Sequence, residues 1–580
     1  MTVALLAAGV TMTGCSNKDN NEPQEPAKVQ TYKMSITASK GADEQANAPK
    51  KVLGLDGSTL TATWATDEEV TVYNETKGAA LTGVLKPQTA GANTTLLGEL
   101  TGTIAAGDVL TLKFLSPSYA SQDGTLEYIS ANCDYATATT TVSSVDAGTI
   151  YTEGTANFAN QQAIVKFTLM KKADNSAVEI PAATALTVSD GTNNYTVTPA
   201  SATNVLFVAI PATNTVNLST TIGAVTYSYD KTATDLLTAG QYYEIGVKMW
   251  REVNLAAISA NTTLLNGDKA TGTLSGNYKI NVNTDGATVT LSNVTINGTN
   301  SDSYQWAGIN CENNTTLVLE GTNTVTSFYE DYPGIHIAEG KTLTIQGSGT
   351  LNASTNGGTN GWGAGIGGSD LVNCGNIVIE SGIINATGGI WMAGIGGGFD
   401  KGCGDITING GIVTAQGGIG GAGIGAGFGN QHSASCGNIT ITDGNVTATG
   451  GKFAAGIGSG CGFGFNTSIS TCGNITISGG TVIAIGGTNG IASDMPEPAY
   501  ASFTNPLVGG AGIGTGSSTD SGTRKGSSSC GTITIGSGVT SVTATKGSGA
   551  ENSIGLNNST YNSGTCGTVT IEPGANVTQN

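Results

Sequence analysis

Residues 374–398 read CGNIVIESGIINATGGIWMAGIGGG, and the three parts of this stretch recur along the chain. A Cys-Gly-Asn-Ile-Val-Ile phrase comes first, a Gly-Ile-Ile-Asn-Ala-Thr-Gly-Gly phrase follows, and Gly-Ile-Gly closes the repeat. Further copies, the last of them shortened, begin at Cys403, Cys436, Cys472, Cys530 and Cys566. A repeat of this size is typical of coils stacked in a solenoid. We therefore expect a long, rigid and mostly uncharged surface in place of a pocket.

Each repeat has room for three short strands and three turns, which is the coil of a right-handed parallel β-helix. Glycines fall where corners need a positive φ or a close approach of two backbones. Between the corners, Ile and Val alternate with Thr and Asn, so the aliphatic side chains point inward. One aliphatic column is expected to contain Ile377, Ile406, Ile439, Ile475 and Ile533.

The composition favours an all-β protein of more than one domain. A chain of 580 residues is too long for one core, and runs of Val, Ile and Thr alternate with turns of Gly, Asn and Asp. Lys and Arg number 23 against 42 Asp and Glu, which gives a net charge of −19. Because phosphate binding needs a basic surface, nucleic acid is excluded as a partner. The acidity is most simply a means of solubility.

The first residues resemble an export signal. Residues 3–10 are apolar but too short to span a bilayer. Small residues and Cys15 follow, as in the lipobox of bacterial lipoproteins, where the cysteine carries the lipid that anchors the protein. We assign 1–15 to a lipoprotein signal peptide and 16–29 to a flexible tether. The alternatives are a plain secretory signal and an untargeted apolar N-terminus.

The acidic tether resembles that of surface-exposed lipoproteins of the Bacteroides group. This resemblance implies an outer-membrane location, with the protein facing outward on a lipid anchor.

Two further sets of phrases resemble known families. Residues 63–70 (TWATDEEV), 158–167 (FANQQAIVKF), 208–212 (VAIPA) and 237–243 (LTAGQYY) resemble strands of fimbrillin-like (Mfa-like) proteins of the Bacteroides type. That family implies tandem transthyretin-like β-sandwiches and a role in pili or cell adhesion. Shaft pilins of the family are typically cleaved after a basic residue, often arginine. The first sandwich has no arginine here, which favours a tip, anchor or stand-alone adhesin.

The second resemblance begins near residue 255. Residues 273–278, 288–296 and 316–323 resemble the start of β-helical carbohydrate-binding domains of bacterial surface proteins. The resemblance allows calcium at turns, although no ligand set is readable.

The expected organisation is a signal peptide, a tether, two sandwiches and a β-helix with an insertion. Their respective ranges are 1–15, 16–29, 30–157, 158–250 and 255–580, with the insertion at about 488–508. Insertions in solenoids form loops that often bind partners, and a passive surface loop is the equal alternative.

The cysteines allow two interpretations. Ten cysteines in an exported protein could form disulfides, or a small apolar thiol could fill an inward corner of every coil. We expect the second, a largely reduced structural stack, because adjacent parallel coils rarely give good disulfide geometry. The stack contains Cys374, Cys403, Cys436, Cys472, Cys530 and Cys566, whereas Cys133, Cys311 and Cys461 fall outside the register.

Metal and catalytic sites are not expected. The chain has no CxxC motif and only two histidines. Parallel β-helices include polysaccharide lyases and hydrolases, which need clustered carboxylates with a basic residue or carboxylates paired at set separations. Here Asp370, Asp400, Asp405 and Asp443 are scattered. Within the predicted β-helix the only adjacent pair is at 330–331, and neighbours on a strand point to opposite faces. We therefore expect no enzyme.

Aromatic side chains near turns are the candidates for binding. Tyr304, Trp306, Trp362 and Trp391 could stack on sugar faces, and Trp362 and Trp391 lie one repeat apart. The alternative is that these rings pack at corners of adjacent coils.

Two functions remain open. The first is a lipid-anchored adhesin that presents a glycan-binding β-helix to host or dietary glycans. The second is a structural stalk or pilus accessory protein that contacts other pilus or surface proteins. A polysaccharide lyase or hydrolase is the weakest alternative.

Overall fold

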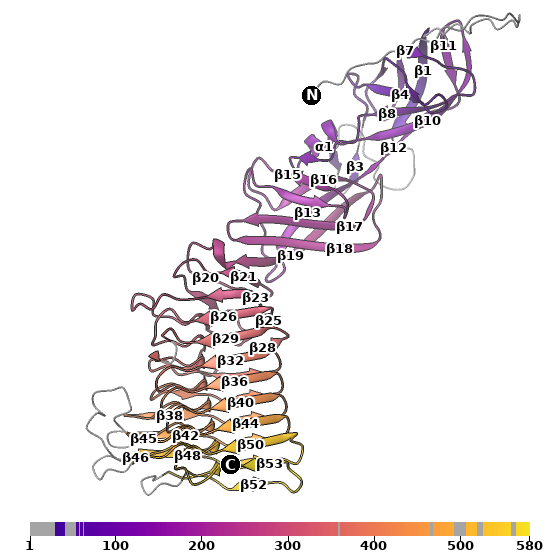
Figure 1. Cartoon of the computed structure of the whole chain (residues 1–580). Coiled ribbons are helices and arrows are strands. Elements are labelled where there is room, and N and C mark those ends of the chain that lie inside the picture. The colour runs from indigo at the N-terminus through magenta and orange to yellow at the C-terminus, as the bar shows by residue number, and fades with distance from the viewer. Residues whose placement is uncertain are drawn as a thin grey trace, which may run out of the picture. The chain divides into compact units, whose positions relative to one another are not determined.

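The computed structural model describes residues 30–40, 54–56, 59–61, 63–357, 360–463, 468–491, 506–518, 526–557 and 564–580. Cys15, the predicted signal peptide and the predicted tether lie outside these residues. The fold is almost entirely β, which confirms the predicted class (Figure 1). Among the described residues, no helix is long and apolar enough to cross a bilayer.

The chain divides into two compact units. The first contains Met1–Phe167, Leu206–Thr215 and Thr232–Ile245, and the second contains Thr168–Val205, Val216–Lys231 and Gly246–Asn580.

The main sheet of the first unit is built from short alternating segments. Its strands are β1 (Gln30–Lys40), β4 (Val70–Asn74), β5 (Ala79–Ala80), β6 (Leu85–Pro87), β7 (Asn93–Gly102), β8 (Val109–Phe114), β10 (Ala136–Asp146), β11 (Thr149–Thr152) and β12 (Ala156–Asn160). The other elements are β2 (Gly54–Asp56), β3 (Thr59–Thr61), β9 (Ser121–Gln122) and the helix α1 (Leu126–Asn132).

The strands of this sheet pair with one another in a closed ring. β1 pairs in parallel with β12 and antiparallel with β7. From β12 the pairing runs through β10, β8, β4 and β6 back to β7. Inside the ring, Trp64 packs edge-on against Phe114 and Phe158, with ring centroids 5.8 and 5.2 Å away. The finer expectation of tandem transthyretin-like sandwiches stays a prediction.

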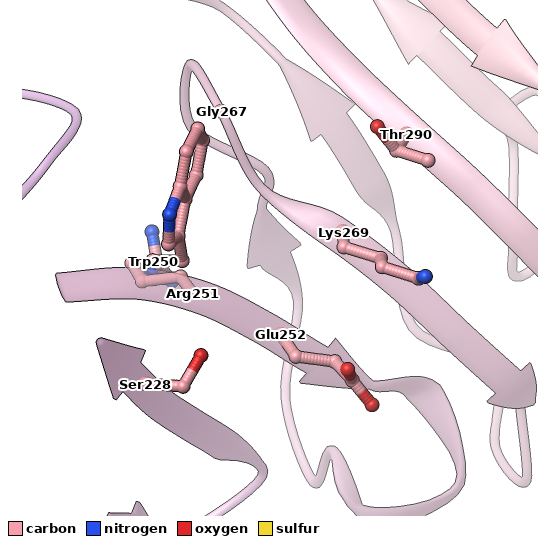
Figure 2. A pocket seen from close by; sticks show the side chains of 7 residues that line it. All are labelled: Ser228, Trp250, Arg251, Glu252, Gly267, Lys269 and Thr290. Atoms are coloured by element: carbon pink, nitrogen blue, oxygen red, sulfur yellow. The ribbon is translucent and has the colours of Figure 1, made fainter. Parts of the chain in front are cut away.

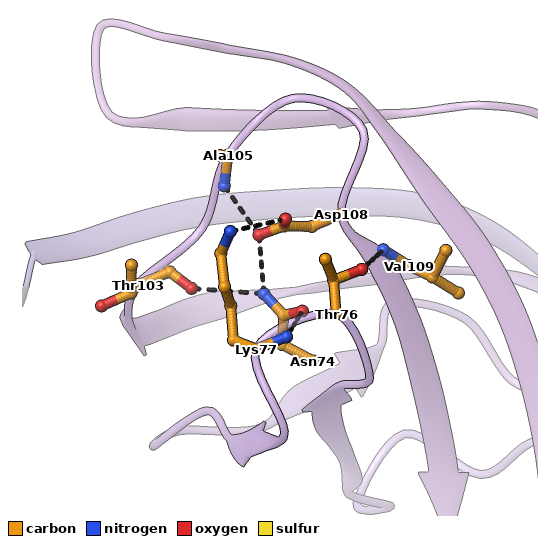
Figure 3. A network of polar contacts seen from close by, with 7 residues as sticks. All are labelled: Asn74, Thr76, Lys77, Thr103, Ala105, Asp108 and Val109. Carbon is orange, nitrogen blue, oxygen red and sulfur yellow. Dashed lines mark hydrogen bonds and ion pairs between the residues drawn. The ribbon is translucent and has the colours of Figure 1, made fainter.

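A buried carboxylate fixes two loops of this unit (Figure 3). Asp108 Oδ2 accepts hydrogen bonds from Asn74 Nδ2 at 2.8 Å and from the Ala105 amide at 2.9 Å, and Lys77 Nζ lies 3.2 Å from Oδ1. Burial alone would raise the pKa of Asp108, but these hydrogen bonds and the ammonium outweigh it and lower the pKa. The Thr76 hydroxyl also accepts a hydrogen bond from the Val109 amide at 2.9 Å.

Seven further strands precede the β-helix. They are β13 (Gln162–Lys171), β14 (Leu186–Ser189), β15 (Asn194–Val197), β16 (Val205–Pro211), β17 (Thr213–Ile222), β18 (Val225–Leu237) and β19 (Tyr242–Asn254). β14 pairs antiparallel with β15, and β18 pairs antiparallel with β19.

Parallel ladders form the rest of the second unit and confirm the predicted β-helix (Figure 1). The first ladder contains β21 (Lys269–Thr273), β23 (Ala287–Ile296), β25 (Thr315–Glu320), β28 (Thr342–Gly347), β31 (Asn376–Ile379), β35 (Ile406–Ile408), β39 (Ile439–Ile441), β43 (Ile475–Ile477), β49 (Ile533–Ile535) and β52 (Val569–Ile571).

The second ladder continues from the end of β23. It contains β26 (Thr322–Thr326), β29 (Thr350–Ser354), β32 (Ile383–Thr387), β36 (Ile412–Gln416), β40 (Asn445–Thr449), β44 (Thr481–Ile485), β50 (Ser541–Thr545) and β53 (Val577–Gln579).

The third ladder contains β20 (Thr262–Thr263), β22 (Ile280–Val282), β24 (Ile309–Cys311), β27 (Ile335–Ile337), β30 (Ile366–Gly367), β33 (Ile395–Gly396), β37 (Ile424–Gly425), β41 (Ile457–Gly458), β47 (Ile513–Gly514) and β51 (Ile554–Gly555).

A short fourth ladder contains β34 (Gly402–Cys403), β38 (Ser433–Cys436), β42 (Ser468–Cys472) and β48 (Gly526–Cys530).

The register places identical side chains one above another. In the first ladder Ile377, Ile406, Ile439, Ile475 and Ile533 are successive partners and are completely buried. The predicted aliphatic column is therefore confirmed. No single coil could bury this interior, so each coil depends on its neighbours.

The six repeat cysteines also share one register, but two of them are joined. Cys374 and Cys403 form a disulfide with their Cα atoms 4.5 Å apart, whereas the other four are free thiols. The expectation of reduced thiols is therefore wrong for this pair. The coil spacing of about 4.8 Å lies within the Cα separations that disulfides tolerate, so adjacent coils can be bridged at this corner.

The described ends of the predicted insertion at 488–508 form a hairpin base. β45 (Gly490–Ile491) pairs antiparallel with β46 (Pro506–Leu507), and residues 492–505 lie outside the described part of the chain. The buried Leu507 side chain joins an aromatic cluster around Trp391.

Strand β19 passes directly into the β-helix. Its last residues, Glu252 to Asn254, pair in parallel with residues 269–271 of β21, and a short 3₁₀ turn η1 (Leu255–Ala257) follows. Residue 250, the predicted end of the second sandwich, therefore lies within a strand of the second unit. This junction positions a pocket lined by residues of β19 and β21.

Candidate functional site

A pocket with a volume of about 290 Å³ lies where β19 meets β21 (Figure 2). Its lining comes from β18, β19, β21, β23 and the turn before β21. The lining residues are Ser228, Trp250, Arg251, Glu252, Gly267, Lys269 and Thr290.

Strand register brings these side chains together. Ser228 of β18 lies opposite Trp250, and Glu252 lies opposite Lys269. Lys269 lies in turn opposite Thr290 of β23. Because side chains two residues apart share a face of a strand, Trp250 and Glu252 point to the same side of β19. Figure 2 shows the Glu252, Lys269 and Thr290 side chains spread across adjacent strands beside the indole ring.

The Trp250 ring is the prominent apolar surface of this pocket. It is 44% exposed, although tryptophan is usually highly buried. The Lys172 Nζ atom lies 3.1 Å from the ring centroid, and this contact fixes the indole by a cation–π interaction. Gly267 lies beside the ring with φ of +83°, a conformation that favours glycine and lets the turn pass close to the indole.

A buried ion pair supports the pocket from within. The Arg251 guanidinium lies 3.2 Å from Asp268 Oδ2, and their side chains are 11% and 1% exposed. Asp268 Oδ2 also accepts a hydrogen bond from the Leu265 amide at 2.8 Å. Burial raises the pKa of Asp268 to about 6, and the Leu265 hydrogen bond and the Arg251 charge offset part of that rise. The pair thus anchors the turn that carries Gly267.

Polar groups surround the indole. Lys269 Nζ bonds Glu320 at 2.8 Å, and this bond lowers the pKa of Glu320. Glu252 accepts a weak hydrogen bond from the Thr271 hydroxyl at 3.4 Å and, among the described residues, forms no ion pair. The pocket therefore combines an aromatic face with hydroxyl, carboxylate and ammonium groups. This combination suits a ligand that has an apolar face and a hydroxyl-rich rim.

Two of the predicted binding residues contribute to packing. Tyr304 and Trp306 are half-buried against the core of the β-helix, with ring centroids 5.4 Å apart. The Trp306 ring also packs against Phe328 at 5.7 Å. Their remaining exposure is partial, so neither presents a whole ring face to solvent.

Trp391 is not available to a sugar. Its side chain is completely buried, and its ring packs against Phe428 with centroids 4.5 Å apart. Trp362 is half-buried, and both tryptophans contact Phe399. The prediction of Trp391 as a binding platform is therefore wrong, because the turns of successive coils bury the ring in an aromatic cluster. For Trp391 the corner-packing alternative holds.

Two carboxylates of the β-helix have raised pKa values. Burial raises the pKa of Asp370 to about 7, and the charge of Asp331 adds to the rise. Burial raises the pKa of Asp331 as well. The Asp370 amide donates a hydrogen bond to the Trp362 carbonyl oxygen at 3.4 Å, so Asp370 lies beside that tryptophan. Within the described ranges, no group of three or more His, Cys, Asp or Glu side chains could hold a metal ion.

Sequence reasoning missed Trp250. The sequence did contain a signal for this site. The Trp-Arg-Glu run at 250–252 stands where charged residues become rarer and Asn, Thr and Gly become more frequent. Its exposure, however, depends on the pairing of β19 with β21, which a local pattern does not reveal.

Comparisons with known proteins give a family-model match and several similar solved structures. A family model described as a beta helix repeat matches residues 377–399, 406–428 and 439–461. A search of curated proteins finds no match.

The solved structures similar to this chain include fimbrial proteins at low identity. A fimbrial protein from Bacteroides ovatus is 10% identical, with 38% of this chain and 49% of that protein covered and a TM-score of 0.22. A fimbrial assembly protein from Parabacteroides distasonis is 12% identical, with 39% and 96% covered and a TM-score of 0.22. The tip fimbrial protein Mfa3 from Porphyromonas gingivalis is 9% identical, with 34% and 80% covered and a TM-score of 0.18. The match thus spans about half of the first of these proteins.

Proposed function

We propose that this chain is a non-catalytic, fimbrillin-like surface adhesin that binds a glycan and is anchored in the outer membrane by lipid on Cys15. Support for the adhesin comes from the fimbrillin-like phrases at 63–70, 158–167, 208–212 and 237–243. Support for the anchor comes from the apolar run and small residues before Cys15. The proposal includes tandem transthyretin-like sandwiches before a right-handed β-helix.

The observation that carries glycan binding is the exposed Trp250 ring in a polar pocket. A pyranose has an apolar face of C–H groups and a rim of hydroxyls. In our proposal the apolar face lies on Trp250, and the rim exchanges hydrogen bonds with Glu252, Lys269 and the hydroxyl of Ser228 or Thr290. The pocket is formed by strands, which hold such a constellation more rigidly than loops do.

Replacement of the ring tests this proposal. Binding of the whole protein to an array of host and dietary glycans should reveal a ligand, and Trp250→Ala should weaken that binding about tenfold, since an aromatic contact contributes about 1 kcal/mol or somewhat more. Tyr151→Ala is the matched control, because that ring is 51% exposed and lies outside the pocket. Equal binding by Trp250→Ala and the wild type would exclude this site.

A structural stalk is the second candidate. The in-register ladders support it, because coils stacked from β21 to β52 form a stiff extended element. The glycan array separates the two functions: retention of no glycan by the wild-type protein would favour the stalk. We also propose that the interacting Asp331 and Asp370 carboxyls are not catalytic, so no new reducing or unsaturated ends should appear in any bound glycan.

A further inference from the structure

The repeat cysteines form a continuous column on adjacent coils. Cys403, Cys436, Cys472 and Cys530 are successive partners in the fourth ladder, where every strand ends on its cysteine. Cys530 forms a parallel bridge with Cys566, and Cys374 precedes Cys403 through the disulfide. Labels β38, β42 and β48 mark three of these strands in Figure 1.

Contacts between sulfur atoms divide this column into pairs. The first pair is the disulfide of Cys374 with Cys403. In another pair, the Cys530 and Cys566 Sγ atoms lie only 2.7 Å apart. Cys436 and Cys472 are direct partners in the register of β38 and β42, and the Cys436 thiol together with burial raises the pKa of Cys472. Each of the three contacts joins neighbouring coils.

The geometry points to three inter-coil disulfides: Cys374 with Cys403, Cys436 with Cys472, and Cys530 with Cys566. A sulfur can bond only to a sulfur on the next coil, since two coils span about 10 Å. Six positions in a row can be fully paired between neighbours in one way alone. The disulfide of Cys374 with Cys403 is the first pair of that arrangement, and any bond between Cys403 and Cys436 would leave Cys374 without a partner.

The chemistry of each new bond is a two-electron oxidation. Two thiols lose two protons and two electrons, and one S–S bond forms. We assign the oxidant to a thiol–disulfide oxidoreductase of the export pathway, whose own disulfide accepts the electrons and is reduced to two thiols through a mixed disulfide. An exported protein meets such oxidants, whereas a cytosolic one is kept reduced.

The other described cysteines lie outside the column and serve as internal controls for the pairing. Cys311 occupies the third ladder between Val282 and Ile337, so neither adjacent coil offers it a sulfur. Cys133 and Cys461 are buried outside the column. Burial raises the pKa of Cys133 and of Cys311 to about 12, which disfavours the thiolate form needed for exchange. These three should remain thiols.

Peptide mapping tests the pairing. The full chain is exported from a bacterial host, unfolded without reductant, alkylated and digested for mass spectrometry. We expect three cross-linked peptides that match the proposed pairs and alkylation of Cys133, Cys311 and Cys461 only, Cys15 being set aside. Alkylated Cys436, Cys472, Cys530 or Cys566 in the wild type, or a link between Cys403 and Cys436, would overturn the proposal.

A single substitution sharpens this test. In Cys472→Ser, Cys436 has no free neighbour, so alkylation should appear at Cys436 while the other two cross-links persist. Cys461→Ser is the matched control, since it should remove one alkylated site and create none. Denaturant exposes every remaining thiol to alkylation, and persistence of the other two cross-links shows that the variant still stacks its coils. An unmodified Cys436 in Cys472→Ser would contradict the proposal.

Discussion

Single polar side chains link one coil to the next. The Oδ1 atoms of Asn376, Asp405, Asn438 and Asn474 each accept a hydrogen bond from a backbone amide in the following coil. Their donors are the amides of Asp405, Asn438, Asn474 and Thr532, at 2.7 to 3.0 Å. An acceptor oxygen at this position satisfies an amide beside the glycine corner, which explains why Asn or Asp follows Cys-Gly in these repeats.

The predicted alternation of inward and outward side chains is confirmed, because it depends only on the local sequence of each strand. Residues 377, 406 and 439 were expected in one column, and a period of two fixes which side chains point inward. The function of the Asn Oδ1 atoms, the disulfide of Cys374 and the exposure of Trp250 were not predictable in the same way. Each depends on the distance between residues on different coils or strands, and a single sequence does not give that distance.

Asp370 supplies a pH-dependent prediction at the residue scale. Its folded pKa of about 7 lies above the unfolded value of about 4. Between these pH values the folded state holds a proton that the unfolded state has lost, so stability decreases as pH rises through this window. Asp370→Asn should therefore raise the free energy of unfolding at pH 8 by about 1–2 kcal/mol, because partial exposure screens the full shift. The gain should vanish near pH 4.

Urea unfolding at pH 4 and pH 8 measures this difference. Asp302→Asn serves as the control, since that side chain is exposed and its replacement should change neither midpoint. A gain from Asp370→Asn that is equal at both pH values would mean that the carboxyl does not titrate as described.

At the scale of the coil, the glycine corners set the packing of the third ladder. Gly425 has φ of +138°, and a Cβ there would meet the carbonyl oxygen of Gly458 in the next coil. The same contact recurs at Gly396 and Gly458 with the coils that follow them. Small corners therefore let successive backbones approach closely, and the Gly-Ile-Gly phrase is a structural requirement in the coils from β30 to β47, where it occurs.

Gly425→Ala should consequently destabilise the β-helix by about 3 kcal/mol or more, since it adds backbone strain to a clash with main-chain atoms that cannot move aside. Gly536→Ala is the matched control. Gly536 does not adopt a positive φ, and the nearest atom to an added Cβ is 3.4 Å away. Urea midpoints of the two variants should differ clearly. A Gly425→Ala midpoint equal to that of Gly536→Ala would show that the ladder can widen locally at little cost.

At the scale of the whole molecule, the β-helix has a polar surface around an aliphatic core. The protein has a net charge of −19, but only a small share of its side chains is charged. Thr and Asn are therefore the main outward-facing residues of the ladders. Hydroxyl and amide groups therefore line the solvent side of these strands. Inter-coil disulfides would add to the resistance of this surface to unfolding, since each closes a loop of 29 to 36 residues.

Attachment to a membrane is the property of the whole molecule that the proposed function requires. Cys15→Ser removes the thiol that would carry lipid, so the protein should move from the membrane fraction to the soluble fraction. The physical reason is that each buried methylene contributes about 0.8 kcal/mol, and two or more acyl chains are needed for stable anchoring.

Cys133→Ser is the control, because that buried thiol lies outside the signal region. Metabolic labelling with a fatty acid should mark the wild type and Cys133→Ser but not Cys15→Ser. If Cys15→Ser stayed labelled and membrane-bound, the anchor would have to lie elsewhere, while the glycan pocket and the disulfide pairs would be unaffected.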